Sequence, residues 1–165
     1  MIKAWSYIEE YKDLRKKILK SIDRTLKSGQ IFFGKEIQKF EKRFIKENNL
    51  KYGVAVGSGT DALYIALLGL GIKRNDEVIT VSNTAIPTIS AINSCGAKPR
   101  FVDIEETTFG LNPKLIPSQI TSNTKAVISM DYGGLSCKIF DILDTTKKNN
   151  LILIDDAAEG LGSSI

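Results

Sequence analysis

The sequence has 165 residues, of which 42% are hydrophobic and 25% are charged, and a net charge of +4. This composition is typical of one globular domain and excludes a collagen-like, coiled-coil or largely disordered chain. No apolar run approaches the ~20 residues that a membrane helix needs, and the first residues do not resemble a signal peptide. The absence of histidine excludes Ser-His-Asp and Cys-His catalysis and any His-ligated metal. The two cysteines make neither a disulfide framework nor a zinc site, so a cytoplasmic protein is expected.

The positive charge is concentrated at the start of the chain. Residues 1–51 hold 14 Lys/Arg against 7 Asp/Glu, whereas the rest of the chain holds 9 against 12. Such a basic segment could bind nucleic acid or anionic lipid. The basic residues alternate with acidic residues and with a helical apolar stripe, however, so solvated helix surfaces are the favoured interpretation.

Two amphipathic helices are predicted in this first part, which is assigned to residues 1–52 as an N-terminal helical segment. Apolar residues at spacings of three and four indicate one helix face, and Ser28-Gly29 indicates its end. The first stripe consists of Ile8, Tyr11, Leu14, Ile18, Ile22 and Leu26. The second consists of Ile37, Phe40, Phe44 and Ile45, and Asn48-Asn49 closes that helix.

From residue 53 onward the pattern predicts strands that alternate with helices. The predicted strands are 53–56, 78–81, 98–102, 126–130 and 151–154, the last of them buried on both faces. The predicted helices are 61–70, 86–94, 113–120 and 139–148. This order predicts an α/β fold of three layers, α/β/α, around a mostly parallel sheet, and residues 53–165 are assigned to this domain.

A glycine-rich turn follows the first predicted strand, with the sequence Gly57-Ser58-Gly59-Thr60-Asp61. Small residues let backbone N–H groups approach an anion, and a helix N-terminus adds partial positive charge. The turn matches neither a Walker loop nor a dinucleotide fingerprint. A phosphate cradle and a plain glycine turn with Thr60 as the N-cap are equally compatible with it.

Three other segments follow predicted strands, where open α/β sheets bind their ligands. Asp155-Asp156 could bind Mg²⁺, act as acid or base, pair with a protonated ring nitrogen, or cap the next segment. The 82–88 segment is polar and turn-like. The glycines of 131–134 indicate either close approach of the backbone to another group or a structural turn.

Together these segments resemble the nucleotide-sugar aminotransferases of the DegT/StrS group. The resemblance rests on "SGQIFFGKEIQKFEKRF", "YGVAVGSGTDALYIAL", "VITVSNTAIPTISAI", "GAKPRFVDIE", "ITSNTKAV", "DYGG" and "IDDAAEGLGS", in this order. It implies a homodimeric, fold-type I enzyme that depends on pyridoxal 5′-phosphate (PLP). Such an enzyme transfers an amino group from glutamate to a keto group of a nucleotide-linked sugar. No nucleic-acid or membrane partner and no metal are implied.

The resemblance also implies roles for individual residues. Gly59, Thr60 and the backbone of Asp61 would hold the cofactor phosphate. Asp156 would pair with the pyridine nitrogen and keep it protonated. Glu159 stands where the family often has Gln, near the phenolic oxygen of the ring. Ala85 stands where many members have an aromatic residue that stacks on the ring.

The family's Schiff-base lysine and its C-terminal small domain correspond to sequence after residue 165. The chain is therefore expected to be the N-terminal, incomplete part of the PLP-binding large domain, with no catalytic residue of its own and no activity alone. The main alternative is a non-catalytic remnant, or one half of a split protein that acts by association. A Rossmann-like nucleotide binder is disfavoured because the glycine spacing fails. A nucleic-acid binder would show salt-sensitive retention on DNA.

Overall fold

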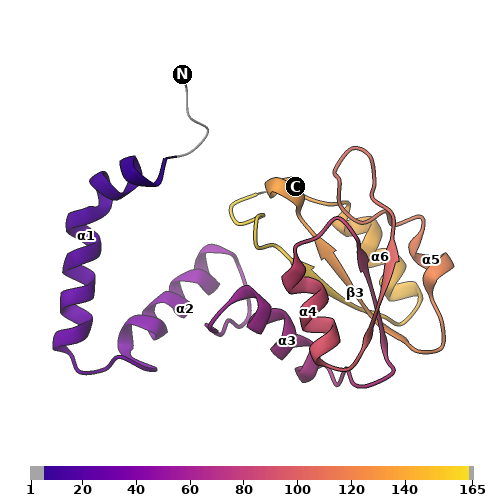
Figure 1. The fold of residues 1–165 in the computed structure, drawn as a ribbon, viewed down its shortest axis with the longest axis horizontal. Coiled ribbons are helices and arrows are strands. Elements are labelled where there is room, and N and C mark those ends of the chain that lie inside the picture. The colour runs from indigo at the N-terminus through magenta and orange to yellow at the C-terminus, as the bar shows by residue number, and fades with distance from the viewer. Residues whose placement is uncertain (1–5, 164–165) are drawn as a thin grey trace. The chain divides into compact units, whose positions relative to one another are not determined.

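The computed structural model describes residues 6–163, and the chain divides into two compact units, Met1–Ala55 and Val56–Ile165 (Figure 1). The first unit contains α1 (Tyr7–Lys27) and α2 (Lys35–Glu47), which confirms both helices expected from the apolar stripes. Gly29 at φ +68° and Asn49 at φ +52° follow the ends of the two helices. A left-handed residue at this place stops a helix and satisfies its last carbonyl groups.

The apolar stripes of α1 and α2 are accessible. Neither helix contains a buried residue, and Ile22 and Leu26 are 50% and 59% exposed. Within this unit, Arg24 Nη2 pairs with Glu36 Oε2 at 3.0 Å and so joins the two helices. Both side chains are well exposed, so this ion pair contributes little stability.

The prediction of a strand at residues 53–56 is wrong. These residues form no strand, and Val54 is 80% exposed. A β-prone run becomes a strand only where a neighbour satisfies its backbone groups. In the described part of the chain no strand pairs with this run, and the Ala55 N–H donates instead to Glu41 Oε1 at 2.9 Å.

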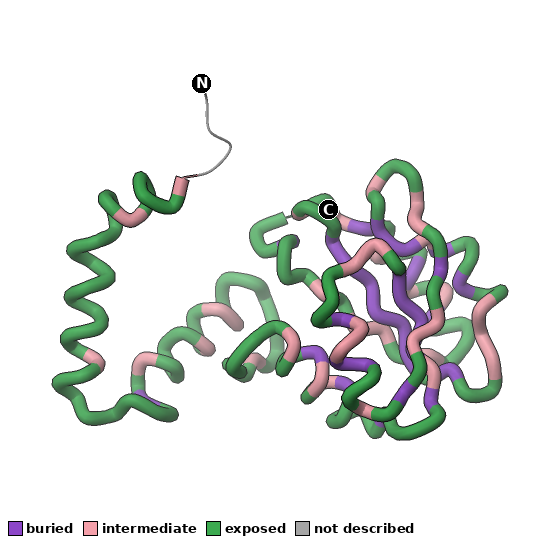
Figure 2. Tube along the Cα trace, in the orientation of Figure 1, coloured by how far each residue is buried: buried purple, intermediate pink, exposed green. Residues whose placement is uncertain are grey.

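The second unit is built on a four-stranded parallel sheet in the order β2-β1-β3-β4. Its strands are β1 (Glu77–Val81), β2 (Lys98–Val102), β3 (Thr124–Met130) and β4 (Ile152–Asp156). The two central strands, β1 and β3, are almost wholly buried, as Figure 2 shows. Continuous apolar runs of this kind are typical of parallel strands that are covered on both faces.

Helices cover both faces of the sheet, which confirms the predicted three-layer α/β fold (Figure 1). On one face, α3 (Gly59–Gly69) and α4 (Ile86–Ser94) pack on β1 and β3. On the other face are α5 (Ile116–Gln119) and α6 (Ile139–Lys148). The first core contains Leu63, Leu67, Val78, Ala91, Ile92, Ala126 and Ile128, and the second contains Ile79, Val81, Leu111, Ile116, Val127 and Ile142.

Several elements differ from their predicted extent, among them the last strand and the helix expected at 113–120. The last strand was expected at 151–154 and buried on both faces, but β4 runs to Asp156 and Ile152 is 37% exposed. β4 is an edge strand among the described residues, so one of its sides has no neighbour. The helix expected at 113–120 is only the four-residue α5. Its start is delayed because Lys114 N–H donates to Asn112 Oδ1 at 3.1 Å in an Asn-Pro turn.

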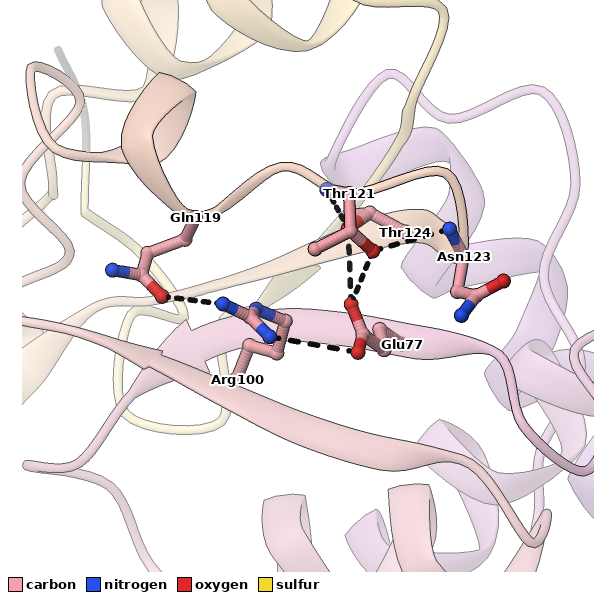
Figure 3. A network of polar contacts seen from close by, with 6 residues as sticks. All are labelled: Glu77, Arg100, Gln119, Thr121, Asn123 and Thr124. Carbon is pink, nitrogen blue, oxygen red and sulfur yellow. Dashed lines mark hydrogen bonds and ion pairs between the residues drawn. The ribbon is translucent and has the colours of Figure 1, made fainter.

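A polar network joins β1, β2 and the segment before β3 (Figure 3). Arg100 donates to Gln119 Oε1 at 3.0 Å and pairs with Glu77 Oε1 at 3.5 Å. The Thr121 hydroxyl donates to the other carboxylate oxygen of Glu77 at 2.6 Å. Because Glu77 begins β1, this network fixes the sheet at the end opposite to the carboxyl ends of the strands.

Among the described residues, no helix has the length and apolar character needed to cross a membrane.

Candidate functional site

A cavity of about 400 Å³ lies at the carboxyl ends of β1, β3 and β4. The chain leaves β1 toward β2 on one side and leaves β3 toward β4 on the other. Open α/β sheets bind ligands at such a reversal of strand order. The cavity is lined by Asn83, Thr84 and Ala85 after β1, by Met130 and Tyr132 around the end of β3, and by Asp156, Ala158 and Glu159 at the end of β4.

Asp156, the last residue of β4, lines this cavity. Its Oδ2 accepts a hydrogen bond from the hydroxyl of Thr88 at 3.1 Å, and its Oδ1 accepts one from the Ala158 N–H at 3.3 Å. Each oxygen of the carboxylate therefore has a donor, one from α4 and one from the turn after β4. An anionic group held in this way can face a cationic partner within the cavity.

Asp155 lies on the other face of β4, because successive residues of a strand alternate in direction. Its Oδ1 accepts from the hydroxyl of buried Ser129 at 2.6 Å. Lost hydration raises the pKa of Asp155, and the charges of Asp131 and Asp156 raise it further, against the lowering effect of Ser129. Of the two neighbouring aspartates, only Asp156 lines the cavity.

Cys137 lies beside Asp155 and Asp131, with their side-chain oxygen and sulfur atoms within 4.8 Å of one another. Burial raises the pKa of the Cys137 thiol to about 12, and the two carboxylates contribute to this shift. A thiol with this pKa is protonated at neutral pH and is a poor nucleophile. Asp131 itself accepts the Cys137 N–H at 2.9 Å, so its carboxylate holds the backbone after β3.

Glu159 joins the segments that follow β3 and β4. Its Oε2 accepts the Gly133 N–H at 2.6 Å. Gly134 has φ +81°, and a Cβ there would lie 3.0 Å from the carbonyl oxygen of Glu159. The glycines after β3 therefore permit both a left-handed turn and a close approach of backbone, the two possibilities left open by the sequence.

Ala85 is the N-cap residue of α4 and lines the cavity beside Thr84. Its methyl group leaves open the space that a larger side chain would fill at this position. Proline follows it in the first turn of α4, where the missing N–H costs nothing. Three of the predicted site residues, Ala85, Asp156 and Glu159, thus surround one cavity.

The other three predicted residues, Gly59, Thr60 and Asp61, form the first turn of α3 and do not line this cavity. The N-cap is Ser58, not Thr60, and its side chain accepts the Asp61 N–H at 3.1 Å. The alternative with Thr60 as the N-cap is wrong because α3 starts at Gly59, two residues before the predicted start at residue 61. Asp61 N–H is thus already paired, and the first-turn N–H groups of Gly59 and Thr60 remain as donors for an anion.

A family model covers almost the whole of this architecture. The model of the DegT/DnrJ/EryC1/StrS aminotransferase family matches residues 12–165. The chain belongs to this family. Among its relatives is the dTDP-3-amino-3,4,6-trideoxy-alpha-D-glucose transaminase of Micromonospora megalomicea subsp. nigra. The two are 33% identical over 160 residues, which make up 97% of this chain and 43% of the relative.

Solved structures of other proteins share the fold of this chain. The chain matches DesV of S. venezuelae, in complex with a ketimine intermediate, with a TM-score of 0.90 and 33% identity over 94% of this chain and 42% of that one. It matches NtdA of Bacillus subtilis, with bound cofactor PMP (pyridoxamine 5′-phosphate), with a TM-score of 0.89 and 33% identity over 91% and 34%. The parallel sheet with helices on both faces is thus shared with fold-type I aminotransferases. The chain spans less than half the length of these relatives.

Some residues in and around this cavity were not singled out from the sequence. Thr88 belongs to a segment that gave only a turn-like pattern, yet its hydroxyl reaches Asp156 across 68 positions of sequence. Tyr132 and Ala158 line the cavity as well. A proline in the first turn of a helix, followed by a hydroxyl residue, is a weak signal for a helix that starts beside a ligand site. This signal would have indicated Thr88, which follows Pro87.

Proposed function

We propose that this chain is the part of a PLP-dependent aminotransferase that binds the cofactor. The complete enzyme would move an amino group from glutamate to a keto group on a nucleotide-linked sugar. The observation that carries this proposal is the Asp156 carboxylate, held by Thr88 and Ala158 at a cavity over the reversal of strand order. Membership of the family supports the same reaction class.

The residues that line the cavity fit a pyridine ring, and the start of α3 offers donors for a phosphate. The cavity of about 400 Å³ suits a small aromatic ring, and Ala85 leaves its wall free of a bulky side chain. Asp156 offers a carboxylate to a protonated ring nitrogen. The two unpaired N–H groups at the start of α3, from Gly59 and Thr60, would hold the phosphate through hydrogen bonds and the helix dipole.

Bound PLP would supply an electron sink for bonds at the amino carbon. The task of Asp156 would be to keep the ring nitrogen protonated, which makes that sink effective. Glu159 would lie near the phenolic oxygen, with its carboxylate oriented by the Gly133 N–H at 2.6 Å. Ala85 would contribute space only, so the ring would be held by its polar contacts.

The binding proposal is tested with pyridoxamine 5′-phosphate and isothermal calorimetry. The chain is expected to bind this ligand, and Asp156→Asn to weaken binding about tenfold or more, because a charge-assisted hydrogen bond is worth about 1.5–3 kcal/mol. Asp155→Asn is the matched control, since it removes the neighbouring carboxylate on the opposite face. Equal affinity of Asp156→Asn and the unmodified chain would contradict the proposal.

The 165-residue chain, assayed alone, is expected to show no amino transfer from glutamate to a keto-sugar nucleotide. The reason is that, in this proposal, the Schiff-base lysine is not among these 165 residues, so the chain would offer sites for the ring and phosphate without the covalent link. Binding without turnover is therefore the expected pair of results from one preparation. Turnover by the pure chain would contradict this part of the proposal. We also propose a homodimer, which the resemblance supports, and a cytoplasmic location, which the low cysteine content supports. Fractionation of the source cells would test the location.

A further inference from the structure

Thr88 is a fully buried hydroxyl residue in the first turn of α4, with 0% of its surface exposed. Its Oγ1 lies 3.1 Å from Asp156 Oδ2 and 2.9 Å from Thr84 Oγ1. A buried hydroxyl in a helix often bonds back to a carbonyl of the preceding turn. Thr88 instead connects two segments at the carboxyl ends of β1 and β4.

The direction of this chain of hydrogen bonds follows from the number of protons. An ionised carboxylate only accepts, so the single hydroxyl proton of Thr88 is donated to Asp156. Between Thr84 and Thr88, the proton must then come from Thr84. The order is Thr84 to Thr88 to Asp156, and each bond polarises the next in the same sense. Thr84 and Asp156 both line the cavity, so this series of hydrogen bonds begins and ends at the cavity wall.

The second oxygen of Asp156 is held from a different direction. The Ala158 N–H donates to Oδ1 at 3.3 Å, which is a longer contact than that of Thr88. Two donors on different oxygens restrict rotation of the carboxylate about its last side-chain bond. Removal of the Thr88 hydroxyl would leave the weaker backbone contact alone to orient the group.

We propose that Thr88 is a positioning residue: its hydroxyl, fixed by that of Thr84, holds the Asp156 carboxylate toward the ring nitrogen of the cofactor. This inference rests on the proposed function, in which Asp156 pairs with that nitrogen. Thr88 itself does not line the cavity and would not touch the ring. Its effect is to keep an anionic oxygen in place before the cofactor binds, so that less ordering is needed on binding.

The experiment uses the full chain and pyridoxamine 5′-phosphate labelled with ¹⁵N at the ring nitrogen. Calorimetry gives the affinity, and the ¹⁵N chemical shift of the bound ligand, followed against pH, reports where the ring nitrogen loses its proton. Thr88→Val is expected to weaken binding about tenfold. It should also lower the pH of ring deprotonation by about one unit, the equivalent of a tenfold change in equilibrium.

Thr88→Ser keeps the hydroxyl and is expected to restore both quantities toward those of the unmodified chain. Thr80→Val is the matched control, because Thr80 is also 0% exposed and donates one hydrogen bond, to the Ile128 carbonyl at 3.1 Å. It should leave the titration of the ring nitrogen unchanged. A purely structural role of Thr88 would lower the melting temperature without moving that titration.

The possible results of these experiments distinguish this inference from the proposed function on which it rests. No binding by the unmodified chain, or unaltered binding by Asp156→Asn, overturns the proposed function and this inference with it. Loss of ring protonation in Asp156→Asn but not in Thr88→Val overturns the inference alone. Loss of ring protonation in both Asp156→Asn and Thr88→Val, with rescue by Thr88→Ser, supports the inference.

Discussion

Gly160 shows how one missing side chain shapes the site. It is buried in the turn after β4, and a Cβ there would contact the carboxylate of Asp131. Asp131 is 6% exposed and holds the Cys137 N–H, so it has little freedom to move away. The two turns that border the cavity on this side therefore pack together only while residue 160 is glycine.

Gly160→Ala is expected to lower the free energy of unfolding by about 1–3 kcal/mol, the usual cost of overpacking a buried site. Gly69→Ala is the control, since a Cβ at Gly69 has nothing within 4 Å and lies in a helix. It should be neutral or slightly stabilising, because alanine is the better helix former. Urea unfolding of both variants gives the comparison, and an equal stability of the two would contradict the steric argument.

At the scale of elements, helix α3 carries both a structural cap and the proposed phosphate donors. Ser58 satisfies the Asp61 N–H, and this leaves the N–H groups of Gly59 and Thr60 at the helix start. Helical periodicity predicted the existence of α3, but only the observed cap shows which N–H groups remain. The same limitation applies to 53–56, whose β-prone residues formed no strand.

Ser58→Ala is expected to cost about 1 kcal/mol of stability, because it leaves the Asp61 N–H without its cap. Ser58→Asp should keep the cap, since aspartate is as good an N-cap as serine. Ser94→Ala, at the exposed end of α4, serves as the control and should change little. Thermal unfolding measures all three variants. A loss in Ser94→Ala equal to that in Ser58→Ala would argue against a specific role of the cap.

At the scale of the whole molecule, the first unit leaves much apolar surface accessible. The helices α1 and α2 have no buried residue, and Phe32 and Phe33 between them are 81% and 91% exposed. Amphipathic helices form because their apolar stripe is covered by a partner. The homodimer that we propose from the family resemblance would supply such a partner.

Sedimentation velocity over a range of concentrations is expected to show a dimer of the 18.2 kDa chain. The reason is that contiguous exposed apolar surface favours association in water. The dimer should dissociate on dilution or in moderate denaturant before the second unit unfolds. A single monomeric species at every concentration would contradict the proposal, and polydisperse aggregates would contradict it equally.

The sequence by itself determined the α/β class, most helices and strands, and the segments that border the cavity. It could do so because these features depend on local periodicity and on glycine, proline and capping residues, which act within a few positions. Helices 86–94 and 139–148 and strand 98–102 were predicted with their observed bounds. The ordered motifs also indicated the family.

Only the tertiary structure decided which residues meet. The hydrogen bonds from Thr88 to Asp156 and from Ser129 to Asp155, and the packing of Gly160 on Asp131, all involve segments that are brought together by the order of the strands. The edge position of β4 and the absence of a strand at 53–56 have the same origin. Pairing and burial depend on neighbours distant in the chain, and no local pattern records them.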